Sequence, residues 1–258
     1  MTESEWLECI DKDDMLNFLR GKVSERKLRL FAAACVRQVW HLLADDRFRK
    51  AVESAEAFAD GLLDMAALSA VHEIALQAWH ALASHNEWAE QRAKFTEYPK
   101  HSAAFAAVMV SWGPSYTEGA HSAVSRGSTS IVNAVWADTN QQQDDEDQRD
   151  SAALDIAYEW QSSVLRDIFG NPFRTVSLAT ACLTPIVISL ATAAYEERLL
   201  PSGELDTTRL AILADALEEA GCDNADILAH LRGPGPHVRG CCVLDLLLLS
   251  GDGRDNLV

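Results

Sequence analysis

The chain has 258 residues, of which 48% are apolar and 24% are charged, as in ordinary soluble globular proteins and unlike disordered ones. Its 39 acidic and 22 basic residues give a formal net charge of −17, and so acidic a surface repels phosphate, which argues against nucleic-acid binding. We find neither a signal peptide nor an uncharged apolar run of about 18 residues, so we expect no export and no membrane span. The six cysteines are then expected to be reduced thiols, and the cytoplasm is the expected location.

The N-terminal region, residues 1–138, has the apolar periodicity of amphipathic helices. Apolar residues recur three and four positions apart in four segments, with short connections that indicate antiparallel neighbours. These predicted helices cover residues 11–19, 24–43, 45–60 and 64–84. Less regular patterns indicate further helices at residues 86–94, 101–112 and 118–138.

Residues 139–150 contain no apolar side chain and are rich in acidic residues and glutamine. Such a segment is typical of a solvated linker or of a polar extension of a helix. It predicts a boundary between the N-terminal region and a C-terminal helical region at 151–258, although one continuous domain is also compatible with the pattern.

The C-terminal region again has helical periodicity, and a Gly-Pro-Gly-Pro turn at 233–236 separates its last two predicted helices. The predicted helices cover residues 151–169, 185–199, 206–220, 223–231 and 237–249. Strand-like alternation is essentially absent. The sequence therefore predicts an all-α fold, a multi-helix bundle or array of about nine to eleven helices with no significant β-sheet.

Four segments carry a family resemblance: residues 24–35, 165–173, 212–222 and 233–241. Together they resemble a large paralogous family of uncharacterised bacterial proteins that end in an ILADALEEAGC…HLRGPGPHVRGC module. The resemblance covers most of the chain except its middle, and it implies no activity. Cys242 departs from the pattern, because an aromatic residue is expected there.

The terminal module contains a candidate metal site formed by Cys222, His230, His237 and Cys241. If the last helix begins at His237, then His237 and Cys241 share one face of it, and a tight hairpin could bring all four together as a Cys2His2 zinc set. The spacings of eight, seven and four residues do not match the paired knuckles of strong zinc motifs. The alternative is that the cysteines are small core residues and the histidines bond to turn carbonyls.

The same turn is a candidate anion site, because Arg232, His237 and Arg239 flank a glycine-rich segment at a predicted helix start. Free backbone N–H groups at such a position favour phosphate or carboxylate. The two prolines remove two of these donors, however. The alternative is a rigid turn whose arginines pair with acids of the chain.

Two motifs that suggest catalysis are better explained without it. Ser24 and Lys27 fit the S-x-x-K pattern of serine acyl-transferases, but the partner motifs and sheet are missing and Ser24 is a suitable helix N-cap. His72-Glu73 begins an H-E-x-x-H pattern, but Leu76 stands at the position of the second histidine. We therefore assign no catalytic residue.

A basic stripe runs along the predicted 24–43 helix and the residues before it, and we interpret it as a solvated face paired with acidic residues of the chain rather than a binding face for an acidic partner or nucleic acid. It comprises Arg20, Lys22, Arg26, Lys27, Arg29 and Arg37.

Taken together, these patterns favour a non-enzymatic, intracellular interaction or scaffold protein with an unidentified protein partner. Two alternatives stay open. One is a metal-dependent or other enzyme whose site is assembled from distant helices. The other is a ligand- or anion-sensing module that uses the turn at 233–237. No cofactor is required, and structural zinc is the one candidate.

Overall fold

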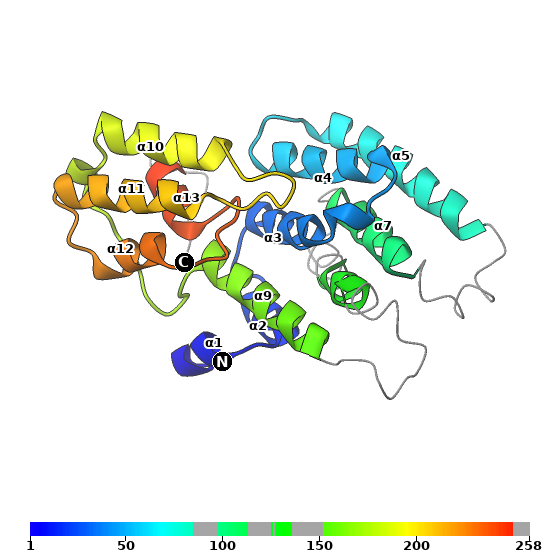
Figure 1. Ribbon diagram of the computed structural model, residues 1–258, viewed down its shortest axis with the longest axis horizontal. Coiled ribbons are helices and arrows are strands. Elements are labelled where there is room, and N and C mark those ends of the chain that lie inside the picture. The colour runs from blue at the N-terminus through cyan, green and yellow to red at the C-terminus, as the bar shows by residue number, and fades with distance from the viewer. Residues whose placement is uncertain (85–97, 113–124, 126, 136–151, 250–258) are drawn as a thin grey trace.

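The computed structural model describes residues 1–84, 98–112, 125, 127–135 and 152–249, and these residues are helical almost throughout (Figure 1). The helices are α1 (Glu3–Glu8), α2 (Lys12–Leu19), α3 (Glu25–Gln38), α4 (Asp46–Ala59), α5 (Met65–Ser84), α7 (Tyr98–Val110), α9 (Ala152–Phe169), α10 (Pro185–Glu196), α11 (Thr207–Glu219), α12 (Ala225–Arg232) and α13 (Cys242–Leu249). Residues 127–135 are helical as well, and Trp40–Leu42 and Thr180–Cys182 form short 3-10 helices. The described residues contain no β-strand, only two isolated bridges, so the all-α prediction is confirmed.

Local capping explains why most helices begin where the sequence predicts. The Ser24 hydroxyl accepts the Lys27 N–H, and the Asp45 and Asp206 carboxylates cap α4 and α11 in the same way. The prediction was one residue off for α12, because Asn224 rather than Asp223 provides the cap.

None of the described helices has both the length and the apolar character needed to cross a membrane.

The N-terminal helix α1 was not predicted. Thr2 and Glu5 form a reciprocal capping box there, in which each side chain accepts the other residue's backbone N–H. Trp6 is fully buried, and its indole N–H donates to the Gly170 carbonyl over 3.1 Å. The Trp6 side chain therefore packs α1 against the end of α9.

Two predicted helices differ most from the structure in their bounds. The helix predicted at 24–43 ends at Gln38, because Val39 leaves helical geometry and a 3-10 turn follows. The helix predicted at 237–249 begins only at Cys242, since residues 233–241 form an irregular loop with left-handed backbone at Gly235 and Gly240. His237 and Cys241 therefore do not share a helical face, and that part of the prediction was wrong.

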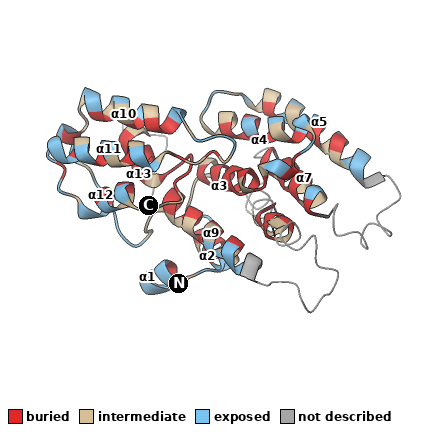
Figure 2. Cartoon of the chain, in the orientation of Figure 1, coloured by how far each residue is buried: buried red, intermediate tan, exposed pale blue. Residues whose placement is uncertain are grey.

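The buried apolar residues form two clusters, and Figure 2 shows buried residues in red on the helices of both. The first contains residues from α1 to α9 and ends at Phe169, apart from Val238, whereas the second contains Cys182 and residues from α10 to α13. The helix α9 packs on α2 and α3, so it lies with the N-terminal helices. The predicted linker at 139–150 and the predicted helix at 86–94 lie outside the described residues.

Charged side chains fill the seam between the two clusters. Arg26 on α3 donates to Asp245 on α13 over 2.7 Å, and Glu56 on α4 accepts from Arg37 over 2.6 Å and from Arg198 over 3.1 Å. The loop at 233–241 enters the same seam, where Val238 joins the first cluster and Cys241 the second. The seam therefore contains buried charged pairs, and the loop contributes one residue to each cluster beside them.

Candidate metal centre

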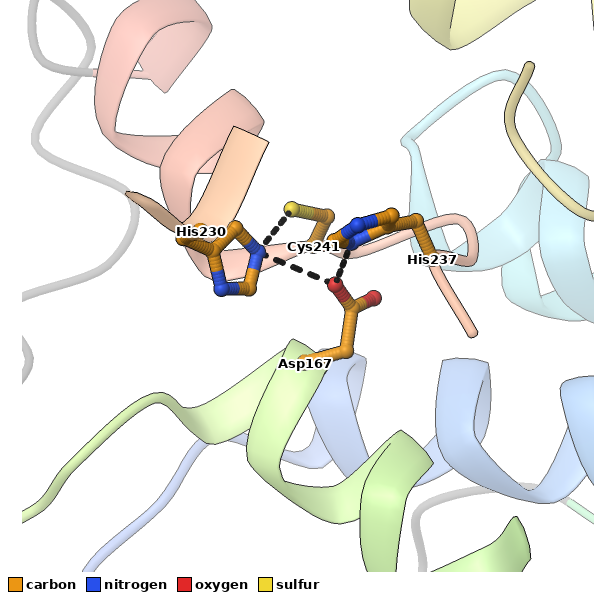
Figure 3. Close-up of side chains that lie close together, drawn as sticks. All are labelled: Asp167, His230, His237 and Cys241. Carbon is orange, nitrogen blue, oxygen red and sulfur yellow. Dashed lines mark hydrogen bonds and ion pairs between the residues drawn. The ribbon is translucent and has the colours of Figure 1, made fainter. Parts of the chain in front are cut away.

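Four side chains converge in the seam: Asp167, His230, His237 and Cys241 (Figure 3). Asp167 comes from α9, His230 from α12, His237 from the 233–241 loop and Cys241 from the residue before α13. One donor atom from each side chain lies within 4.8 Å of all the others. The cluster therefore joins the first apolar cluster to the second at one point.

The donor atoms point toward one another at hydrogen-bonding distances. Asp167 Oδ1 lies 2.8 Å from His237 Nδ1 and 3.1 Å from His230 Nε2, and the same His230 nitrogen lies 3.1 Å from Cys241 Sγ. Tetrahedral zinc, with bonds of about 2.0 Å to nitrogen or oxygen and about 2.3 Å to sulfur, holds its ligand atoms roughly 3.3–3.5 Å apart. Small side-chain adjustments would bring the four donors to that spacing.

A second layer of contacts orients two of the four side chains. His237 Nε2 lies 3.3 Å from the Gly233 carbonyl, and Asp167 Oδ2 accepts the Val238 N–H over 2.9 Å. If His237 Nε2 donates to Gly233, then Nδ1 presents a lone pair to the Asp167 carboxylate. Two lone pairs at 2.8 Å require a cation between them, either a second proton or a metal ion. In metal sites, a histidine that binds the metal through one ring nitrogen commonly donates the N–H of its other ring nitrogen to a carbonyl.

The cluster is shielded from water. Asp167 is 3% exposed, His237 5% and Cys241 0%, whereas His230 is only partly buried. Burial raises the pKa of Asp167, but the hydrogen bonds from His230 and His237 outweigh it and lower that pKa below its ordinary value. Burial raises the pKa of the Cys241 thiol, so without a metal this side chain is a neutral thiol.

The set Cys241, His230 and Asp167 has the composition of a catalytic triad but not its geometry. A triad uses one imidazole nitrogen for the nucleophile and the other for the acid. Here His230 Nε2 contacts both the thiol and the carboxylate. The buried thiol with a raised pKa is also a poor nucleophile. The arrangement therefore fits a shared cation better than nucleophilic catalysis.

The structure brings together three of the four residues predicted as a metal site and replaces the fourth. Cys222 is buried in the second apolar cluster beside Cys182, whose pKa is raised by burial and by Cys222. Asp167 takes its place and was missed, because 63 residues separate it from His230. Its signal in the sequence is a carboxylate among the buried apolar residues Val164, Leu165 and Ile168.

The residues of the predicted anion site have separate partners. Arg232 donates to Asp215 over 2.7 Å and also to Glu218, both on α11. Arg239 Nε lies 2.7 Å from Asp60 Oδ2, and its guanidinium stacks on the Tyr195 ring. The two arginines do not converge on His237, and each has the acidic partner that the alternative interpretation expects.

Three residues of the basic stripe, Lys27, Arg29 and Arg37, are buried rather than solvated, so the prediction of a solvated face was wrong for them. The predicted pairing with acidic residues is present at Arg26, with Asp245, and at Arg37, with Glu56. Lys27 is fully buried and donates to the Ile168 carbonyl over 2.9 Å, and Arg29 donates to the Val110 carbonyl over 2.7 Å. Ser24 acts only as the cap of α3. His72 Nδ1 lies 3.1 Å from Ser111 Oγ and takes part in no described metal cluster.

Comparison of the chain with protein-family models, with curated proteins and with solved structures yields no match. The resemblance to a paralogous bacterial family therefore stays a prediction, and the site must be interpreted from its own geometry.

Proposed function

We propose that this chain is a non-enzymatic, zinc-binding helical scaffold in which Asp167, His230, His237 and Cys241 hold one structural Zn²⁺. The observation that carries the proposal is the placement of His237, with Nε2 toward the Gly233 carbonyl and Nδ1 2.8 Å from Asp167 Oδ1. When Nε2 carries the proton, a cation is required between Nδ1 and Oδ1, and two further donors, His230 Nε2 and Cys241 Sγ, lie around the same point.

The donor set favours zinc over other biological metals. Calcium and magnesium prefer shells made of oxygen, whereas two imidazoles and a thiolate suit a borderline-soft ion. Zinc would also deprotonate Cys241, whose thiol is otherwise neutral at this buried site. Four protein ligands complete a tetrahedral shell and leave no position for a substrate, which supports a structural rather than a catalytic role.

The proposed ion would connect the two sides of the seam through its ligands. Asp167 belongs to α9, which packs with the N-terminal helices, whereas His230 and Cys241 flank the loop that leads into α13. Zinc would fix this loop and, through it, the relative placement of the two apolar clusters. A rigid helical frame of this kind suits a protein that presents surfaces to a partner.

The wider setting supports the same proposal. All six cysteines are free thiols, which fits the cytoplasm as location. The net charge of −17 favours a protein partner over a nucleic acid.

The metal content of the purified protein tests the proposal. Protein purified without added chelator should contain about one zinc ion per chain by elemental analysis. Cys241→Ser and His237→Ala should lower that content, whereas Cys222→Ser, a matched change of a buried thiol outside the cluster, should retain it. Metal-free parent protein that stays fully folded and does not take up added zinc would overturn the proposal.

The scaffold role needs a separate measurement. A partner isolated with the parent protein should bind Cys222→Ser protein with the same affinity and Cys241→Ser protein more weakly. Without the zinc ion, the two apolar clusters are no longer fixed relative to each other. Equal affinity for all three proteins would mean that zinc does not support partner binding.

A further inference from the structure

A pocket of about 830 Å³ lies beside the metal centre. Its walls come from α1, α2, the end of α9 with the turn at 170–176, α12 and α13, so both halves of the chain contribute to it. His230 and Cys242 form part of the wall, whereas Asp167, His237 and Cys241 do not. The pocket is therefore a separate space next to the proposed zinc site.

The pocket has the size and the lining of a small-molecule site. Sites for small organic ligands typically have volumes of about 300–1,000 Å³ and mostly apolar walls with a few polar groups. Here large apolar side chains from five helices and the turn at 170–176 line the space. They include Trp6, Leu19, Phe169, Phe173, Ile227 and Leu246. An occupant should therefore carry a substantial apolar part.

The charged side chains that line the pocket differ in whether each has a partner of opposite charge. Asp245 is 2.7 Å from Arg26, and Arg174 is paired with Glu3 and lies 3.9 Å from Asp226. Arg166 has no carboxylate within 4.0 Å among the described residues. It donates instead to the carbonyls of Trp6 and Cys9 and to the Ser162 hydroxyl.

The guanidinium of Arg166 also retains hydrogen-bonding capacity. It carries five N–H donors, and the contacts to Trp6, Cys9 and Ser162 use four of them. The side chain is only partly buried, so it can meet an occupant of the pocket. An anionic group there would neutralise a charge that the described protein residues leave unpaired.

We infer that the pocket binds a small aliphatic carboxylate, with its chain against the apolar walls and its carboxylate at Arg166. A carboxylate fits because it is planar and can accept the remaining N–H of one guanidinium, whereas a phosphate dianion would call for more basic groups than this pocket offers. The inference goes beyond the proposed zinc site and does not depend on it, since Arg166 and the apolar walls are not zinc ligands.

Calorimetric titration of the full chain with octanoate, decanoate and dodecanoate, and with alcohols of the same lengths, tests the inference. We expect saturable binding of one carboxylate per chain. Affinity should rise about fourfold for each added methylene while the chain fits. The matched alcohols should bind at least tenfold more weakly. Absence of saturable binding by all three carboxylates would overturn the inference, and equal binding by the alcohols would overturn the role of Arg166.

A pair of matched variants locates the site. Ala229 is an exposed helical residue in the pocket wall, so Ala229→Trp should fill the space and weaken carboxylate binding at least tenfold. Ala70 is an exposed helical residue on α5, which does not line the pocket, and Ala70→Trp should bind as the parent does. Undiminished binding by Ala229→Trp would place the carboxylate elsewhere and overturn the inference.

Discussion

Replacement of Gly240 tests whether the 233–241 loop is packed as tightly in the seam as the structure indicates. Gly240 has φ of +91°, and a Cβ atom there would lie 2.8 Å from Leu30 Cδ1 and 3.3 Å from Leu30 Cβ. Left-handed backbone costs a residue other than glycine about 1–2 kcal/mol, and overpacking of a core costs about 1–3 kcal/mol more. Gly240→Ala should therefore lower the free energy of unfolding by about 2–5 kcal/mol.

Gly221 provides the matched control for this prediction. Its φ is +89°, but a Cβ atom there would meet nothing within 4 Å, so Gly221→Ala should cost only the backbone strain of about 1–2 kcal/mol. Urea unfolding followed by far-UV circular dichroism gives both free energies. If Gly240→Ala destabilises no more than Gly221→Ala, the close approach of the loop to α3 is absent and our description of the seam is wrong.

Three further predictions concern the seam and α1. Glu56→Gln should lower the free energy of unfolding by about 3–5 kcal/mol, because Arg37 and Arg198 would keep buried charges with no carboxylate; a loss below about 1 kcal/mol would contradict this. Burial raises the pKa of Glu56, but the hydrogen bonds from both arginines outweigh burial and lower that pKa below 4.5. The ionised Glu56 side chain therefore contributes its full stabilisation of the fold above pH 4.5, and this contribution declines as the pH falls through the pKa of Glu56 in the folded protein. Unfolding free energy measured against pH should therefore fall less steeply below pH 4.5 in Glu56→Gln than in the parent, and parallel curves would exclude Glu56 as the cause. Trp6→Phe removes the indole bond to Gly170 and should make α1 open more easily by about 1 kcal/mol; unchanged amide hydrogen exchange in α1 would contradict that role.

Local sequence signals were enough to predict most helices, because caps and apolar spacing act within one or two turns. Ser24 and Asp206 each accept a backbone N–H from the first turn, as their positions suggested. The same reasoning failed for the last helix, because a proline after a turn does not by itself start a helix. The backbone is left-handed at Gly235 and Gly240, and α13 begins only at Cys242.

The candidate site was only partly predictable for a related reason. His230, His237 and Cys241 lie within 12 residues of one another, so their proximity follows from one turn. Asp167 reaches them only because α9 packs against the far side of the seam, a contact that no local pattern indicates. Cys222 is close in sequence, but it follows the C-terminal turn of α11 and joins the core beside Cys182.

The burial of Arg26, Lys27 and Arg37 has the same origin. On α3 alone these side chains look like a solvated face, since their partners Asp245, Ile168 and Glu56 lie on three other helices. Long-range pairing of this kind depends on the tertiary arrangement, which helix propensity and apolar spacing do not determine.

X-ray absorption at the zinc edge of the purified, zinc-loaded chain tests the proposed metal centre most directly. We predict a four-coordinate shell with one sulfur at about 2.3 Å and three nitrogen or oxygen ligands at about 2.0–2.1 Å. Cys241→Ser should remove the sulfur, and Cys222→Ser should leave the spectrum unchanged. A shell with two sulfur ligands would instead match the Cys222-containing set predicted from sequence, and a shell without sulfur would exclude Cys241; either result would contradict the proposed Asp167, His230, His237 and Cys241 site.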